Sequence, residues 1–303
     1  MSPRAAPIRE MFRAFPPRRG ALSVPLSSRK AALTALSSYP ACRPQALWVQ
    51  RAVRAAVGVF GPRILPGPSY TWTPPPDAEV WDELLGRWHD ELGPFQTMAV
   101  YQRNARPGFA LLLFDDGNPV AYVKVRREQR TTLWEYKALT SVRDHETRLF
   151  RCPEPLSAGT VDGYSYLAST VLSREPFHPP DDPPLEALAE EISGALVDLP
   201  RDPDVPAHWR PMHGDLTPWN LRTGPGAGLI LFDWENAGYG PPLADVVLYR
   251  IVERVLYGDS TRPDGAREAM EFWRAEFQRR NEDPDLNPLA RSLEDTLSRW
   301  MES

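Results

Sequence analysis

The chain has 303 residues, and its 42% hydrophobic and 25% charged content suits a globular protein with one large two-lobed domain or two smaller ones. No apolar run approaches the length of a membrane span, and Cys42 and Cys152 lie far apart without metal-like partners, which argues against a disulfide framework or a zinc site. The net charge is −5, but residues 1–70 carry eleven Lys and Arg against one acid, so this part is +10 and the rest is −15.

Residues 1–70 are predicted to form a basic N-terminal extension. Residues 1–28 are rich in Pro, Arg and Ser without a periodic pattern, and we interpret them as a flexible or loosely docked tail. Helices are expected at 29–37 and 45–59, and the second is amphipathic and carries arginines. Packing on a neighbouring element is its ordinary use, and weak contact with an anionic surface is the alternative. Residues 62–76, rich in Pro and Gly, indicate a linker.

Residues 71–174 are predicted to form a lobe built on a small antiparallel sheet. After a helix at 78–92, strands at 95–101, 109–114 and 119–125 alternate with turn sequences, which predicts a three-stranded meander. A helix is expected at 131–142. Strands at 156–160 and 164–172 flank Asp162-Gly163, a strong hairpin signal.

Residues 175–303 are predicted to form a mainly helical lobe. A Pro-rich crossing at 175–184 precedes an amphipathic helix at 185–199, and further helices are expected at 243–257, 264–280 and 288–301. Together the two lobes predict an α+β fold.

The most informative stretch is 212–234. Asp215 and Asn220 lie five residues apart on a short loop, where a carboxylate can accept a proton and an amide oxygen can bind a divalent metal. Asp233 follows the apolar run 229–232, which is typical of a buried strand that delivers a second metal ligand. Two ligands around one Mg²⁺ and a separate carboxylate are what phosphoryl transfer requires.

The order His213-Gly-Asp-Leu-x-x-x-Asn220, then Asp233-Trp-Glu235, then Gly238-x-Gly-x-x-x-x-Asp245, resembles the aminoglycoside phosphotransferase and choline kinase-like family. The resemblance covers about residues 212–250. It implies a two-lobed protein-kinase-like fold, and Trp-Glu after Asp233 in place of Phe-Gly argues against a protein kinase.

The resemblance also implies a role for individual residues in the sheet lobe. Lys124, in the third strand of the meander, would bind the α- and β-phosphates of the nucleotide, with Glu135 as its partner. The turn from Asn104 to Gly108 would cover the phosphates, although it has a single glycine. The adenine-binding hinge would lie at Ser169, Thr170 and Val171.

In the helical lobe the resemblance implies that Asp215 takes the proton of the acceptor hydroxyl, and that Asn220 and Asp233 bind Mg²⁺. As supporting residues, His213 would hold the catalytic loop and Asp245 would anchor the metal-ligand loops. Trp219 would either face the acceptor or pack in the lobe, and Glu235 would either bind the acceptor or fix the loop.

The expected function is therefore an O-phosphotransferase that uses ATP, or another nucleoside triphosphate, and Mg²⁺ to phosphorylate a small molecule. The acidic balance of residues 71–303 favours a cationic acceptor such as an aminoglycoside or aminosugar. The long basic N-terminal extension gives equal weight to a sugar or related metabolite of a biosynthetic pathway. The alternative is a pseudokinase or binding module that holds an anionic partner through residues 1–70. A cytoplasmic location is expected, with neither a nucleic-acid partner nor a transmembrane segment.

Overall fold

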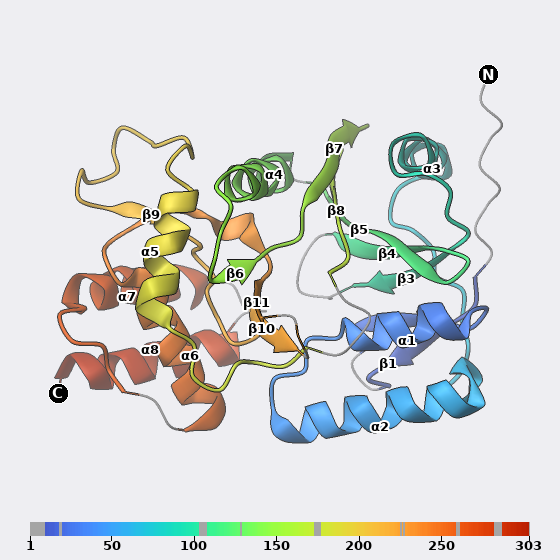
Figure 1. The fold of residues 1–303 in the computed structure, drawn as a ribbon, viewed down its shortest axis with the longest axis horizontal. Coiled ribbons are helices and arrows are strands. Elements are labelled where there is room, and N and C mark those ends of the chain that lie inside the picture. The colour runs from blue at the N-terminus through green and yellow to red at the C-terminus, as the bar shows by residue number, and fades with distance from the viewer. Residues whose placement is uncertain are drawn as a thin grey trace. The chain divides into compact units, whose positions relative to one another are not determined.

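The computed structural model describes residues 10–17, 20–102, 108–127, 129–172, 177–224, 226, 228–258, 261–281 and 287–302. The chain separates into two compact units (Figure 1). Unit 1 comprises Met1–Tyr136 and Pro153–Phe177, and unit 2 comprises Lys137–Cys152 and His178–Ser303. Unit 1 is built on an antiparallel sheet and unit 2 is mainly helical, so the predicted α+β class is confirmed.

The sheet of unit 1 has seven strands in the order β1-β2-β3-β4-β5-β8-β7. Its strands are β1 (Phe12–Phe15), β2 (Leu22–Pro25), β3 (Thr97–Tyr101), β4 (Phe109–Asp115), β5 (Asn118–Arg126), β7 (Pro155–Val161) and β8 (Tyr164–Ser169). The predicted meander is β3, β4 and β5, and the predicted hairpin across Asp162-Gly163 is β7 and β8. Both of these predictions are confirmed.

The two faces of the sheet have separate apolar cores because successive side chains of a strand point to opposite faces. In β4, Leu111 and Leu113 pack in the core that includes Trp81 and Trp88 of helix α3 (Ala78–Leu92). Their neighbour Leu112 packs in the other core, together with helix α1 (Arg29–Ser37). Helix α2 (Pro44–Phe60) and the short helix η1 (Pro62–Ile64) follow α1.

The described part of the N-terminal segment corrects one expectation. Residues 12–15 and 22–25 form β1 and β2, and β2 pairs with β3, so this part is not a loose tail. The buried carboxylate of Glu10 accepts hydrogen bonds from Leu26 N (3.2 Å) and from the hydroxyl of Thr97 (2.9 Å), and it also bonds Ser27. These bonds attach the segment to the sheet, and they are invisible in a proline- and arginine-rich composition.

Unit 2 combines two small sheets with helices. One sheet has the order β10-β11-β6, from β10 (Leu221–Gly224), β11 (Gly228–Leu231) and β6 (Phe150–Arg151), and the other pairs β9 (Arg210–Met212) with β12 (Gly238–Gly240). The helices are α5 (Leu185–Ala195), η2 (Trp234–Asn236), α6 (Ala244–Tyr257), α7 (Arg267–Asn281) and α8 (Asn287–Glu302). Helix α4 (Gln129–Asp144) contributes residues to both units. Among the described helices, none is long and apolar enough to cross a membrane.

Candidate active site

Strand β9 leads into a tight turn at Gly214. Its φ is 73°, in the left-handed region, and a Cβ atom there would lie 2.1 Å from the carbonyl oxygen of Asn236. Only glycine fits both the conformation and the close approach. The turn therefore holds His213 and Asp215 against the segment that follows Asp233.

Asp245, at the start of α6, holds this turn through hydrogen bonds to its backbone. Its buried carboxylate accepts hydrogen bonds from the backbone N–H groups of His213 (2.7 Å) and Gly214 (3.0 Å). Burial raises the pKa of Asp245 to about 6, and the two backbone hydrogen bonds oppose that rise. Asp245 thus contacts the loop backbone, as an anchoring residue does.

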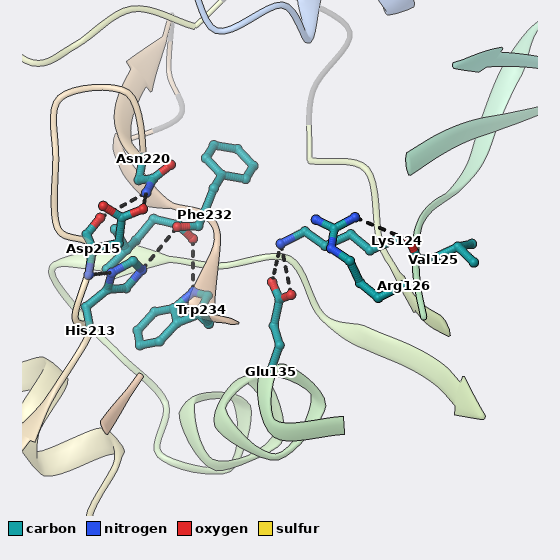
Figure 2. A network of polar contacts seen from close by, with 10 residues as sticks. Lys124, Val125, Arg126, Glu135, His213, Asp215, Asn220, Phe232 and Trp234 are labelled. Atoms are coloured by element: carbon teal, nitrogen blue, oxygen red, sulfur yellow. Dashed lines mark hydrogen bonds and ion pairs between the residues drawn. The ribbon is translucent and has the colours of Figure 1, made fainter. Parts of the chain in front are cut away.

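The buried ring of His213 connects two segments of the site (Figure 2). Its Nε2 lies 3.1 Å from the carbonyl oxygen of Phe232, and its Nδ1 accepts a hydrogen bond from the N–H of Asp215 at 3.1 Å. A carbonyl only accepts and a backbone N–H only donates, so the ring is neutral with its proton on Nε2. It also packs edge-on against buried Trp234, with ring centroids 4.6 Å apart.

Asp215 and Asn220 are brought together within the loop. The Asn220 amide nitrogen donates to the Asp215 carbonyl oxygen and to its Oδ2, both at 2.9 Å (Figure 2). With both amide hydrogens engaged on one side, the amide oxygen of Asn220 points to the other side, as a metal ligand requires.

The segment that leads into Asp233 lies beside Asn220, because the β10–β11 pairing continues one step beyond Leu221 and Leu231. Leu221 pairs with Leu231, and the N–H of Phe232 donates to the Asn220 carbonyl oxygen at 3.0 Å. Asp233 itself has φ 67° and ψ 66°, a left-handed conformation that is uncommon for a residue with a side chain and is concentrated at functional positions.

Glu235 provides a second carboxylate in the same segment. One carboxylate oxygen of Glu235 and one of Asp233 lie within 4.8 Å of each other. Two carboxylates this close repel each other unless a cation lies near them. Carboxylate and amide oxygens are the hard ligands that Mg²⁺ prefers, so Asp233 and Glu235, and Asn220 by its side-chain type, are residues that could hold a magnesium ion.

Two tryptophans are adjacent in sequence to the predicted metal ligands, Trp219 before Asn220 and Trp234 after Asp233. Trp219 is partly occluded by the apolar cluster of α6, α7 and α8 but is not part of its buried core. Trp234 is fully buried, between His213 and Phe150, and its role was not expected from the sequence. The signal was present in the sequence, since Trp234 follows the apolar run 229–232 by only two residues and extends the core of that strand.

In unit 1, Lys124 and Glu135 form an ion pair. The Lys124 Nζ lies 2.7 and 2.8 Å from the two carboxylate oxygens of Glu135 (Figure 2). The side chains are only 13% and 4% exposed. On β5, Lys124 alternates with buried Val123 and Val125, so strand periodicity turns it away from their core.

Four other predicted nucleotide-binding residues of unit 1 are described, at Gly108, Ser169, Thr170 and Val171. Gly108 precedes β4 with φ 135°, and a Cβ there would lie 2.5 Å from the carbonyl oxygen of Val125. Ser169 ends β8 and is buried, and the Thr170 N–H donates to Glu154 at 2.9 Å. Val171 packs against the α1 core. Asn104 lies outside the described residues.

Residues 198–289 match the family model for the phosphotransferase enzyme family (APH). A comparison with curated proteins finds no match.

Similar solved structures include a thermostable mutant of aminoglycoside phosphotransferase APH(4)-Ia in its apo form, which is 15% identical (69% of this chain, 87% of that chain, TM-score 0.41). Amicoumacin kinase hAmiN, in complex with AMP-PNP, Ca²⁺ and Ami, is 12% identical (73% and 86%, TM-score 0.44). A putative fructosamine-3-kinase from Haemophilus somnus is 9% identical (73% and 97%, TM-score 0.45). Likeness at this level carries no information on activity.

The family match includes the loop of Asp215 and Asn220, the segment of Asp233 and the start of α6 with Asp245. It confirms, for residues 198–289, the predicted resemblance to the phosphotransferase enzyme family.

Proposed function

We propose that the protein is an ATP- and Mg²⁺-dependent O-phosphotransferase that phosphorylates a hydroxyl group of a small molecule. The observation that carries the proposal is the Asp215–Asn220 pair. Its two hydrogen bonds orient a carboxylate and leave an amide oxygen for a metal, beside Asp233. The family match over the same residues supports this chemistry.

In the proposed reaction, Asp215 accepts the proton of the acceptor hydroxyl through a carboxylate oxygen. The acceptor oxygen forms a bond to the γ-phosphorus while the bond from that phosphorus to the β-phosphate oxygen breaks, and ADP leaves. Lys124, held by Glu135, binds the α- and β-phosphates. His213 and Asp245 keep the loop of Asp215 in place through the hydrogen bonds described above.

Asn220 and Asp233 would hold Mg²⁺, with Glu235 as an additional carboxylate. The bound ion would neutralise charge on the β- and γ-phosphates. The metal role of Asp233 is tested by Asp233→Asn, which is expected to weaken Mg²⁺-dependent nucleotide binding at least about tenfold, since it removes a charged ligand. A calorimetric titration identical to that of the wild type would reject this role.

The net charge of residues 71–303 supports a cationic acceptor. Residues 71–303 carry −15, and an acidic surface attracts a cationic, hydroxyl-rich molecule such as an aminoglycoside or aminosugar. Neutral sugars and related metabolites are the other proposed acceptors.

The test of the base is Asp215→Asn, with Asp198→Asn at an exposed position as the matched control. We expect the first variant to lose turnover by at least about 100-fold in a coupled ADP-release assay, because general-base catalysis contributes roughly 10²–10⁴-fold. Nucleotide binding and the unfolding midpoint should stay near those of the wild type. Near-normal turnover in Asp215→Asn would refute the assignment.

A further inference from the structure

Helix α2 is held on one side only. It contacts α1 and η1, and α1 in turn contacts strands β2, β3 and β5. The side chain of Gln50 is buried, and its amide nitrogen donates to the carbonyl oxygens of Leu36 (2.6 Å) and Tyr39 (2.9 Å) at the end of α1. Val57 is the other fully buried residue of α2. These contacts order the helix and leave its outer side uncovered within the described residues.

The outer side of α2 is apolar. Four residues spaced four, three and four apart lie in one line along a helix of 3.6 residues per turn: Trp48, Ala52, Ala55 and Val59. Trp48 is 71% exposed and Val59 is 67% exposed, and Phe60 beside them is 69% exposed. We call Trp48, Ala52, Ala55, Val59 and Phe60 the outer stripe. The outer stripe has large exposed apolar side chains at its two ends and exposed alanines between them, and an exposed apolar surface of this kind marks an interaction site.

The surroundings of the outer stripe are cationic. Residues 11–76 contain no Asp or Glu. Three exposed arginines lie on α2 or just beyond its ends, at Arg43, Arg51 and Arg63. From α1, exposed Arg29 donates a hydrogen bond to the carbonyl oxygen of Gly58 in α2 at 3.3 Å. The partner that complements this surface must therefore combine negative charge with an apolar layer.

An anionic lipid bilayer has both properties. Apolar side chains can insert between acyl chains while arginines contact the lipid phosphates, and neither contact requires a matched shape. A second copy of this chain fits less well, because pairing two outer stripes would bring two acid-free cationic surfaces together. We propose that the outer stripe of α2 and its flanking arginines dock the protein on an anionic membrane surface.

The test is co-sedimentation of the full-length protein with vesicles of phosphatidylcholine alone and with vesicles that also contain phosphatidylglycerol. We expect binding to the anionic vesicles, and loss of that binding when sodium chloride rises from about 0.1 M to about 0.5 M. Trp48→Ser should lower the partition coefficient about tenfold. Arg51→Gln should lower it about fivefold, the effect of one basic residue near a charged surface.

Matched controls are Val197→Ser and Arg148→Gln, which change an exposed valine and an exposed arginine of unit 2. Both should bind vesicles like the wild type, and circular dichroism should show that all four variants are folded. Equal binding of the wild type to neutral and anionic vesicles would overturn the proposal, as would equal binding of Trp48→Ser and the wild type. A dimer in sedimentation velocity that Trp48→Ser dissociates, without vesicle binding, would replace it with self-association.

Discussion

Replacing Asp245 with Asn tests how the catalytic loop is held. Asp245 has a pKa of about 6 in the folded chain against 3.8 for an unperturbed carboxyl, and burial is the main cause. The folded state therefore binds this proton more tightly than the unfolded state does. The contribution of protonated Asp245 to the free energy of unfolding is fully present below pH 3.8 and is lost as pH rises through about 6. The difference between these two pKa values corresponds to roughly 3 kcal/mol of unfolding free energy.

Asp245→Asn removes this titration. Its amide oxygen can replace one acceptor, but its NH₂ group then faces the N–H of His213 or Gly214, and an unpaired buried donor costs roughly 1–3 kcal/mol. At pH 7.5 the wild type buries an ionised carboxylate at position 245, and the variant does not. The stability that the variant gains by losing this buried charge nearly cancels the cost of its unpaired donor. We therefore expect little change in stability at pH 7.5 but a variant clearly less stable than the wild type at pH 4.5, with reduced turnover throughout.

The assay is urea unfolding of both proteins from pH 4.5 to 7.5, where the difference in their unfolding free energies isolates Asp245. Asp198→Asn is the control, because that carboxyl is exposed and its replacement should give a difference that does not vary with pH. A flat difference for Asp245→Asn as well would refute the buried, proton-binding role.

Two further predictions concern the ion pair and the turn. Lys124→Met should weaken ATP binding and cost roughly 3–5 kcal/mol of stability, because it removes the cation that contacts both oxygens of the buried Glu135 carboxylate. Adding Glu135→Gln should restore stability but not nucleotide affinity, and recovery of both would show that Lys124 does not bind phosphate. Gly214→Ala should abolish most turnover and destabilise the fold by more than the roughly 1–2 kcal/mol of left-handed strain, since its Cβ would meet Asn236 O. Gly226→Ala, at φ 67° with open space, carries the strain alone, and equal effects of the two would exclude the clash.

Local patterns predicted the parts of the fold that short-range chemistry determines. The turn Asp162-Gly163 predicted the β7–β8 hairpin, and helix α3 has the predicted bounds. The predicted strand at 119–125, which carries Lys124, forms as β5. The contact of Lys124 with Glu135 came from the family resemblance and not from spacing, because strand and helix periods do not specify which residues meet.

Long-range contacts explain what the sequence could not predict. Strands β1 and β2 have four residues each, too few for a periodic signal, and the hydrogen bonds of Glu10 to residues far along the chain fix them. The position of Trp234 against His213 depends on the pairing of β10 with β11, which a loop sequence does not reveal. The outer stripe of α2 required knowing which side of that helix packs on α1.

Acceptor-dependent release of ADP tests the central claim most directly. The wild-type protein, with ATP and Mg²⁺, is assayed against aminoglycosides, aminosugars, neutral sugars, choline-like alcohols and nucleosides, with mass spectrometry of the acceptor to detect the added phosphoryl group. We predict that at least one class is phosphorylated at a rate that depends on Mg²⁺ and on Asp215. Saturable binding of Mg²⁺ and ATP without phosphorylation of any acceptor would contradict the phosphotransferase assignment and favour a binding module.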